Sequence, residues 1–271
     1  MDIKLIAMDL DGTALQADHI HFSPRLDAAL AEAHRRGIVI LPITGRQFGA
    51  LPLPLTCHPV WEDLVVTCNG GRICRLATGE ELHSLLLTRQ VMEQLTALSR
   101  QFDIPLEYCI NSRLHLTQKA LEQMQGLPQL TFHRDVILPR HGRFVETLDG
   151  LSGSEKAQLP HIPESCREAV CHALKAIDVS AVWSSASSME ITHAQATKAF
   201  GLQWVCRLKN IPLEAVMALG DSGNDESMLR AAGLGIAMGN APDAVKSWAD
   251  AVTAANTEDG AAIAIERYAL T

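Results

Sequence analysis

Two acidic clusters in the sequence each follow a short apolar run, and their side chains are the ones best suited to chemistry. The first is Asp9 and Asp11 in the stretch KLIAMDLDGTAL, and the second is Asp221 and Asp225 in GDSGND. A carboxylate that is buried without a partner costs free energy, so each acid requires a cation, a proton or water beside it. Hard oxygen ligands of this kind suit Mg²⁺, which usually binds one or two carboxylates and keeps several waters. The two clusters together therefore indicate a magnesium site.

Each cluster taken alone also fits simpler interpretations. Asp-Gly is common in turns, and the pattern D-x-D-G also begins a calcium loop of the EF-hand type. Such a loop has glycine at its sixth position and glutamate at its twelfth, but counting from Asp9 these positions hold Ala14 and Ile20. The sequence thus excludes that calcium loop, whereas a solvated turn stays open for either cluster by itself.

Two further residues have groups that suit a phosphate ligand. Thr44 in ITGR has a hydroxyl at the end of another apolar run, and Gly45 beside it lets a backbone amide approach closely. A hydroxyl and exposed amides are suitable donors to phosphate oxygens. Lys198 in HAQATKAF lies near the start of a predicted helix, although most lysines are only solvated surface residues.

Three apolar runs have to position these side chains. LIAMD, IVILPIT and AVMALGD end at Asp9, Thr44 and Asp221. Their continuous apolarity is typical of parallel strands that are covered on both faces. In such sheets ligands bind beyond the carboxyl ends of the strands, so the sequence predicts that the three polar residues converge.

A helix is predicted between the first two strands, from residue 24 to about residue 36. Ser23 is the expected N-cap, Pro24 occupies the first helical position and Gly37 follows the end. The order strand, helix, strand predicts an α/β fold with a doubly wound, Rossmann-like parallel sheet.

The middle of the chain has a different pattern, which predicts an inserted domain. Helical stretches such as TRQVMEQLTALSRQF alternate there with strand-like stretches such as LEYCINSRLHLT. We expect an α+β cap over residues 85–186, and a discontinuous core of residues 1–84 and 187–271.

Composition narrows the classes of partner and compartment. The chain of 271 residues carries a formal net charge of −8, which argues weakly against nucleic acid or an anionic membrane as a partner. No stretch reaches the roughly 18 apolar residues of a membrane helix, and the N-terminus runs directly into the first strand. The seven cysteines contain no C-x-x-C pair. We therefore expect a cytoplasmic protein with reduced thiols.

The order of DLDGT, ITGR, a lysine before a helix, and GDSGND resembles the haloacid dehalogenase-like phosphohydrolases. The resemblance is greatest to the Cof-type branch, whose larger cap is inserted between the second and third motifs. It extends to CNGG, MEIT, GIAMGNAPDAVK and TEDGAA, and so covers both parts of the expected core. The resemblance implies a Mg²⁺-dependent phosphatase that hydrolyses small phosphorylated metabolites, with sugar phosphates the foremost class.

The resemblance also implies a role for each acid. Asp9 would attack phosphorus and carry the phosphoryl group as an aspartyl-phosphate, while Asp11 would protonate the leaving oxygen and then deprotonate water. Mg²⁺ would be held by the side chains of Asp9 and Asp221 and by the backbone carbonyl of Asp11. Asp225 would orient that coordination shell or bind the ion through water.

The phosphoryl group would be bound by residues from all the motifs. The side chains of Thr44, Lys198 and Asn224 would contact it, together with amides near Leu10 and Gly45. Arg46 could contact the substrate or form a salt bridge within the core loop. The chain departs from the family where Ala199 follows the lysine, because glycine is frequent there, and this puts a close backbone approach at residue 199 in doubt.

Two other readings stay open on sequence alone. A phosphomutase or phosphotransferase would use the same core. A small-ligand-binding regulatory protein on this scaffold would be expected to have lost one of Asp9, Asp11, Lys198 and Asp221, all of which are present. The sequence does not specify which phosphoester is the substrate, and it does not indicate an oligomeric state.

Overall fold

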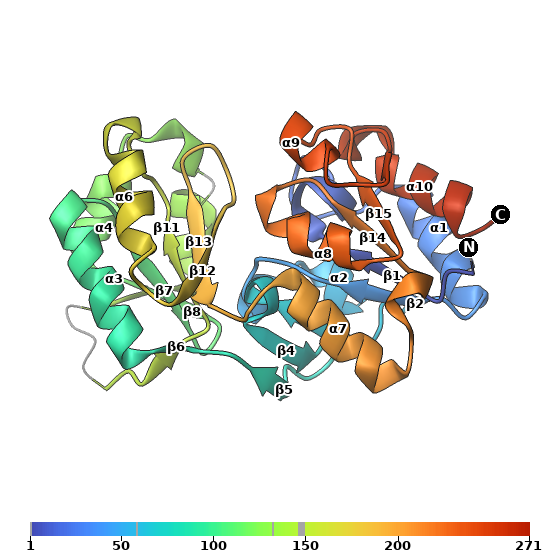
Figure 1. Cartoon of the computed structure of the whole chain (residues 1–271), viewed down its shortest axis with the longest axis horizontal. Coiled ribbons are helices and arrows are strands. Elements are labelled where there is room, and N and C mark those ends of the chain that lie inside the picture. The colour runs from blue at the N-terminus through green and yellow to red at the C-terminus, as the bar shows by residue number, and fades with distance from the viewer. Residues whose placement is uncertain (1, 58, 132, 146–149) are drawn as a thin grey trace. The chain divides into compact units, whose positions relative to one another are not determined.

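The chain divides into two units in the computed structural model, which describes residues 2–57, 59–131, 133–145 and 150–271 (Figure 1). Unit 1 consists of Met1–Arg46, Leu51–His83 and Thr197–Thr271. Unit 2 consists of Gln47–Ala50 and Ser84–Ala196. Unit 2 is therefore inserted, apart from its four-residue segment, between two pieces of unit 1.

The central sheet of unit 1 is parallel across its described strands, in the order β16-β15-β14-β1-β2. The strands are β1 (Leu5–Met8), β2 (Val39–Pro42), β14 (Val216–Gly220), β15 (Leu234–Ala237) and β16 (Ala251–Val252). The three apolar runs of the sequence form β1, β2 and β14, and β1 lies between the other two. The predicted parallel α/β core is confirmed.

A smaller sheet extends unit 1 beside β2. It contains β3 (Leu64–Thr67), β4 (Arg72–Arg75) and β5 (Glu81–Ser84), with β3 and β4 antiparallel. An isolated parallel bridge joins Ile43 to Val66, so the chain just beyond β2 runs along β3. This bridge positions Thr44, whose N–H donates to the carbonyl of Val66 at 2.8 Å.

Helices cover both faces of the central sheet. The described α-helices of unit 1 are α1 (Pro24–Arg35), α2 (Leu53–Cys57), α7 (Lys198–Lys209), α8 (Glu226–Ala231), α9 (Asp243–Lys246) and α10 (Gly260–Tyr268). The connections β1-α1-β2 and β14-α8-β15 run in opposite directions across the sheet, so right-handed crossovers place α1 and α8 on opposite faces. In the described part of the chain, no helix has the length and apolarity to cross a membrane.

The first helix begins and ends as its sequence predicts. The Oγ atom of Ser23 accepts the N–H of Leu26 at 3.1 Å, Pro24 is the first helical residue, and Gly37 has φ +79° just beyond the end. The buried residues of α1 are Leu26, Ala29, Leu30 and Ala33. The Ser23 cap and the apolar face were both predicted from local spacing and are confirmed.

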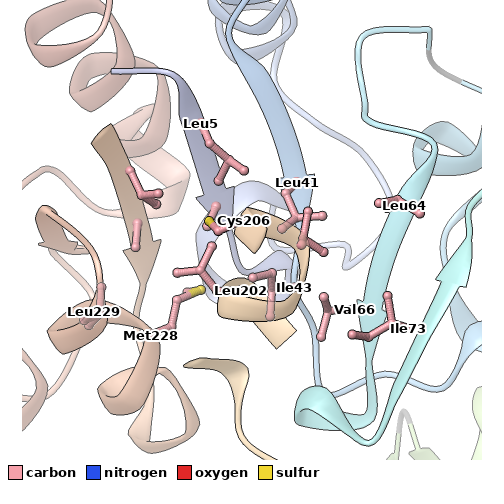
Figure 2. Packing of buried hydrophobic residues seen from close by; sticks show 14 of the residues in the cluster. Leu5, Leu41, Ile43, Leu64, Val66, Ile73, Leu202, Cys206, Met228 and Leu229 are labelled. Atoms are coloured by element: carbon pink, nitrogen blue, oxygen red, sulfur yellow. The ribbon is translucent and has the colours of Figure 1, made fainter. Parts of the chain in front are cut away.

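One face of the central sheet packs against α7 and α8 (Figure 2). Leu5 and Leu41 of the sheet meet Leu202 of α7 and Met228 of α8, and all four side chains are fully buried. Burial of this kind contributes about 25 cal/mol for each Å² of apolar surface removed from water. The cluster therefore fixes α7, and with it Lys198, against the sheet.

Unit 2 is an α+β body built on a mixed sheet with the described order β12-β13-β11-β7-β8-β9. The described strands of unit 2 are β6 (Leu87–Thr88), β7 (Glu107–Ile110), β8 (Arg113–Leu116), β9 (Gly142–Phe144), β10 (Gly153–Ser154), β11 (Lys156–Leu159), β12 (Val179–Trp183) and β13 (Met189–His193), of which β6 and β10 pair separately. Its helices are α3 (Arg89–Phe102), α4 (Gln118–Met124), α5 (Leu138–His141) and α6 (Arg167–Leu174). Apolar residues of α3 and α6 form a separate core with β7, β11 and β13.

The end of unit 2 lies later in the chain than the boundary expected at residue 187. MEIT forms most of β13, which pairs with β11 and β12 inside the sheet of unit 2. Its alternation of Met189 and Ile191 with Glu190 and Thr192 is typical of an antiparallel strand. The chain enters the last piece of unit 1 at Thr197, directly before α7.

Candidate active site

The carboxyl ends of three neighbouring strands bring together the polar residues predicted from sequence. Met8, the last residue of β1, pairs with Pro42 of β2 and with Leu219 of β14. Asp9, Thr44 and Asp221 therefore follow strands that end at the same edge of the sheet. Asp9 and Thr44 are almost fully buried, at 5% and 1% exposure.

Lys198 is fully buried and joins two of the acids. Its Nζ atom lies 2.6 Å from Oδ1 of Asp9 and 2.6 Å from Oδ1 of Asp225. Burial alone would lower the pKa of Lys198, but the two carboxylates outweigh it and raise the pKa above its usual value. The lysine is thus held as an ammonium ion beside Asp9.

The start of α7, which positions this lysine, is fixed by contacts within unit 1. Thr197 is the N-cap and accepts the N–H of Phe200 at 3.1 Å. Gly70, at φ +96°, lies so close to Thr197 that a Cβ atom there would be 2.2 Å from the Thr197 carbonyl oxygen. The N–H of Ala199 donates to Oγ of Ser227 at 3.2 Å, so the residue after the lysine is bound to α8.

Asp225 uses both oxygens to hold groups of the protein. Oδ1 accepts from Lys198, and Oδ2 accepts the backbone N–H groups of Asp221 and Ser222 at 2.9 and 3.0 Å. Gly220 makes room for this loop, because a Cβ atom there would lie 2.4 Å from Cγ of Asp225. Three charge-assisted or backbone donors occupy a carboxylate that has no exposed surface.

Asp221 completes a group of three carboxylates. One oxygen from each of Asp9, Asp221 and Asp225 lies within 4.8 Å of the others. Burial, followed by the charge of Asp225, raises the pKa of Asp221 to about 7. Burial also raises the pKa of Asp9 well above its usual value, with Lys198 opposing the shift and the other two acids adding to it. Three carboxylates thus face one ammonium group, and this surplus of negative charge fits a divalent cation.

Groups from two loops also contact Asp221. Its Oδ1 accepts from Oγ1 of Thr13 at 3.1 Å. Nδ2 of Asn240 lies 3.5 Å from its Oδ2 and donates to the Gly12 carbonyl at 2.9 Å. Gly12 has φ +74°, and a Cβ atom there would lie 2.4 Å from Oδ2 of Asp221. The loop after β1 therefore packs directly on this carboxylate.

A polar wall next to the carboxylates is formed by Thr44, Asn69 and Asn224. The carbonyl of Thr44 accepts the N–H of Asn69 at 3.0 Å, and Oδ1 of Asn69 accepts from Nδ2 of Asn224 at 3.2 Å. Asn69 has φ +54°, in the left-handed region that asparagine tolerates better than most residues. CNGG is thus the turn that links two loops: a backbone hydrogen bond joins it to the segment after β2, and the side-chain amides of Asn69 and Asn224 join it to the loop after β14.

Asp11 is bound by Arg46 and His19. The Nε and Nη2 atoms of Arg46 donate to Oδ2 and Oδ1 of Asp11 at 2.7 and 2.6 Å, and Nδ1 of His19 lies 2.8 Å from Oδ1. Burial would raise the pKa of Asp11, but the bonds from His19 and Arg46 outweigh it and hold the pKa well below its usual range. Of the two roles open for Arg46 on sequence alone, the structure shows a salt bridge within unit 1.

Comparison with known proteins assigns the chain to a family. The model of the haloacid dehalogenase-like hydrolase family matches residues 6–265. The chain belongs to this family. It is 29% identical over 280 residues to the 5-amino-6-(5-phospho-D-ribitylamino)uracil phosphatase YcsE of Bacillus subtilis, with 100% of this chain and 97% of the relative covered. It is also 29% identical to phosphatase YwpJ of the same organism, with 96% and 98% covered.

Solved structures show the same fold. A haloacid dehalogenase-like hydrolase from B. subtilis superposes with a TM-score of 0.82 and 27% identity, covering 98% of this chain and 100% of that one. The family and the named relatives identify the chain as an enzyme of the phosphoric monoester hydrolase class. A purely regulatory ligand-binding protein is therefore not the reading that the comparisons support.

The structure brings together most of the site residues that were predicted from the sequence. Asp9, Asp221, Asp225 and Lys198 form one connected group, and Thr44 and Asn224 belong to the adjoining wall. The side chain of Leu10 is fully buried.

Four residues of the site were not predicted. They are Thr13, His19, Asn69 and Asn240. Thr13, Asn69 and Asn240 lie inside DLDGT, CNGG and GIAMGNAPDAVK, so the resemblance contained a signal for them. His19 lies in a polar loop whose sequence offers no comparable signal.

Proposed function

We propose that the chain is a Mg²⁺-dependent phosphatase that hydrolyses phosphate monoesters of small metabolites, sugar phosphates first among them, through a phosphoryl group carried on Asp9. The observation that carries this proposal is the position of the Asp9 carboxylate. It follows β1, is held at Oδ1 by the buried ammonium of Lys198, and lies within 4.8 Å of Asp221.

The donor set fits Mg²⁺, whose ligands are preferably oxygens. Asp9 and Asp221 would hold the ion with their side chains, and the backbone carbonyl of Asp11 would be a third ligand. Asp225 is already occupied by Lys198 and by two backbone amides. We therefore assign Asp225 to holding Lys198 and the loop, with any contact to the ion made through water. The ion would supply charge neutralisation between the anionic nucleophile and the anionic phosphate.

In the first step a carboxylate oxygen of Asp9 forms a bond to phosphorus while the bond from phosphorus to the leaving oxygen breaks. The leaving oxygen takes a proton from Asp11. Lys198 offsets the charge of the transferring group, and the Thr44 hydroxyl, the Asn224 amide and the backbone amides near Leu10 and Gly45 bind its oxygens. Positioned donors of this kind supply most of the acceleration in phosphoryl transfer.

In the second step water attacks the aspartyl-phosphate. The bond between phosphorus and Asp9 breaks, Asp11 takes the proton of the water, and free phosphate leaves with Asp9 regenerated as a carboxylate. Dividing the reaction in two replaces one difficult displacement by two easier ones. Uncatalysed hydrolysis of phosphate monoesters is so slow that acceleration can reach about 10²¹-fold, and a covalent intermediate provides part of this.

Unit 2 is assigned the role of the cap that selects the leaving group. The relative YcsE is named as a phosphatase of 5-amino-6-(5-phospho-D-ribitylamino)uracil, in which the phosphate is carried on a ribityl chain. The inserted position of unit 2 between the ITGR segment and Lys198 supports a cap role, because the catalytic motifs all lie in unit 1. Small phosphorylated polyols and sugars are accordingly the substrates to test first.

The test is phosphate release from a panel of sugar, polyol and cofactor phosphate esters, with Mg²⁺ and with EDTA. We expect turnover of one or a few esters by the wild-type protein, no turnover with EDTA, and none by Asp9→Asn. Asp243→Asn, which changes an exposed carboxylate on α9, is the matched control and should keep full activity. Isomerisation of a sugar phosphate without release of phosphate would replace the phosphatase by a phosphomutase.

A further inference from the structure

The two oxygens of the Asp11 carboxylate are bound unequally. Oδ1 accepts from Nη2 of Arg46 at 2.6 Å and faces Nδ1 of His19 at 2.8 Å. Oδ2 accepts from Nε of Arg46 at 2.7 Å. Oδ1 only accepts hydrogen bonds, both in the ionised carboxylate and in a carboxyl group protonated at Oδ2, so Nδ1 of His19 carries a hydrogen and donates it.

Each carboxylate oxygen has about two acceptor positions. Among the described residues, both positions of Oδ1 are taken, whereas Oδ2 has one donor and keeps one position. His19 makes this difference, because the arginine alone binds each oxygen once. The open position on Oδ2 is therefore the place where a substrate or water oxygen can exchange a proton with Asp11.

The loop that carries His19 is built to hold the ring in this place. Asp18 Oδ1 accepts the N–H groups of Ile20 and His21 at 2.9 and 3.0 Å, which closes a tight turn around residue 19. The N–H of His19 donates to the carbonyl of Gln16 at 2.9 Å, and His19 itself has φ +59°. A left-handed conformation is uncommon for a residue other than glycine, and at His19 the turn closed by Asp18 accounts for it.

Arg46 ties this loop to the same carboxylate. Its Nη2 atom donates to the carbonyl of His19 at 2.9 Å as well as to Asp11. The side chains of His19 and Asp11 are 46% and 40% exposed, so ring and carboxylate meet at the accessible side of unit 1 rather than in its core. A hydrogen bond at such a site contributes little to folding compared with one in the core.

We propose that His19 is a positioning residue for proton transfer: it holds Oδ1 of Asp11, so that Oδ2 gives the proton to the leaving oxygen and later takes the proton of the attacking water. This inference rests on the proposed phosphatase function. Asp11 enters each turnover with the proton that it took from water in the preceding one. In the first transfer the O–H bond at Oδ2 breaks as one forms on the leaving oxygen, and in the second an O–H bond forms again at Oδ2 as one of water breaks, which restores the starting state. His19 itself loses and gains no proton in either step.

The test uses the dependence of the rate on the leaving group. An alkyl leaving oxygen needs the proton of Asp11, whereas p-nitrophenolate is stable enough to leave without it. General acid catalysis contributes roughly 10²–10⁴-fold to such steps, and we assign about tenfold of this to positioning by His19. The measured quantity is kcat/KM, which reports the steps up to the first phosphoryl transfer when that transfer is irreversible.

For His19→Ala we expect kcat/KM to fall about tenfold with the best alkyl phosphate of the wild-type protein, and to stay within about twofold with p-nitrophenyl phosphate. His19→Asn should recover much of the loss, because an asparagine amide can donate from nearly the position of Nδ1 and tolerates a positive φ. His21→Ala, in the same turn but in contact with Asp18 instead of Asp11, is the matched control and should behave as wild type.

Two results would overturn the inference. They are an equal fall of kcat/KM with both esters, and no fall with either ester, each in His19→Ala with the wild-type melting temperature. If His19→Ala does not fold, we use the ratio of kcat/KM for the alkyl phosphate to kcat/KM for p-nitrophenyl phosphate in His19→Asn and His19→Gln. A ratio equal to that of the wild type in His19→Asn, together with a tenfold lower ratio in His19→Gln, still supports positioning. Equal ratios in these two contradict it. A wild-type protein that hydrolyses no alkyl phosphate contradicts the proposed function itself, before any variant is compared.

Discussion

The ammonium group of Lys198 lies 2.6 Å from Oδ1 of Asp225, the same distance that separates it from Oδ1 of Asp9. The other oxygen of Asp225 accepts the N–H groups of Asp221 and Ser222. One buried carboxylate therefore fixes the lysine and the loop that carries the next acid. Within the described part of the chain, the Asp9 carboxylate accepts from a single donor, Nζ of Lys198 at Oδ1, which suits a nucleophile.

Removing this carboxylate should cost both stability and activity. Breaking a buried ion pair by deleting one partner typically costs about 3–5 kcal/mol, because the other charge stays buried without compensation. We expect Asp225→Ala to lose about that much free energy of unfolding in urea titrations, and to lose phosphate release as well. Asp225→Asn keeps an oxygen that can accept from the two backbone amides, so its stability should lie between that of the wild type and that of Asp225→Ala. A stability loss below about 1 kcal/mol for Asp225→Ala would contradict the anchoring role.

Two glycines with similar backbone angles allow a test of the packing on Asp221. Gly12 has φ +74° and Gly37 has φ +79°, but a Cβ atom at residue 12 would meet Oδ2 of Asp221 at 2.4 Å, whereas at residue 37 it would meet nothing within 4 Å. Alanine in this region costs about 1–2 kcal/mol in either case. We expect Gly37→Ala to lose stability alone, and Gly12→Ala to lose at least tenfold in kcat in addition. Urea unfolding and phosphate release, measured on both variants, separate the two effects.

Mg²⁺ binding should be visible without any turnover. A ligand that binds the folded chain stabilises it by about 2.7 kcal/mol at a concentration of 100 times its dissociation constant. We expect millimolar Mg²⁺ to raise the melting temperature of the wild-type protein, and to leave that of Asp221→Asn unchanged. Asp243→Asn should respond as the wild type does. An equal rise in wild type and Asp221→Asn would remove Asp221 from the ion site.

The stability of unit 2 should depend on pH through His133. Nε2 of His133 lies 2.8 Å from Oε2 of Glu107, a carboxyl with no exposed surface. Burial would lower the pKa of His133 and Lys156 also opposes its charge, but Glu107 outweighs both and raises the pKa above its usual value. A raised folded-state pKa stabilises the protein fully below the unfolded pKa of about 6.5, and this stability is lost as pH rises through the folded-state pKa.

The measurement is urea unfolding of wild type and His133→Gln from about pH 5 to pH 9. Wild type should lose stability as pH rises above about 6.5, and His133→Gln should show a flatter profile over the same window. The difference between the two proteins should therefore be largest at the acidic end. A difference that grows toward alkaline pH would mean that the His133 ring is bound in its neutral form.

The strand-end acids could be predicted because their signal is local. A continuous apolar run followed by Asp9 or Asp221 predicts a strand and its end, and parallel strands then place such ends at one edge. The cap of α1 at Ser23 was predictable for the same reason, since a serine followed by proline has a narrow range of local uses. In each case a few neighbouring residues determine the outcome.

Contacts between distant loops could not be predicted in this way. His19 contacts Asp11 where Arg46, from the loop after β2, binds both residues, and nothing within a few residues of His19 indicates that contact. The boundary of unit 2 presented the same difficulty. The change of sequence pattern near residue 187 led to the expectation that MEIT belongs to the core, whereas its pairing partners β11 and β12 place it in the sheet of unit 2.

The contact between Gly70 and Thr197 has a consequence for how such a protein can evolve. Thr197 is the first residue after the inserted unit, and it is held by groups of unit 1 immediately before Lys198. Insertions, deletions and substitutions within residues 84–196 do not have to move the lysine, because contacts within unit 1 fix Thr197. If unit 2 has the proposed role of a cap, changes in this unit can alter the choice of substrate while the phosphoryl-transfer residues proposed in unit 1 keep their positions.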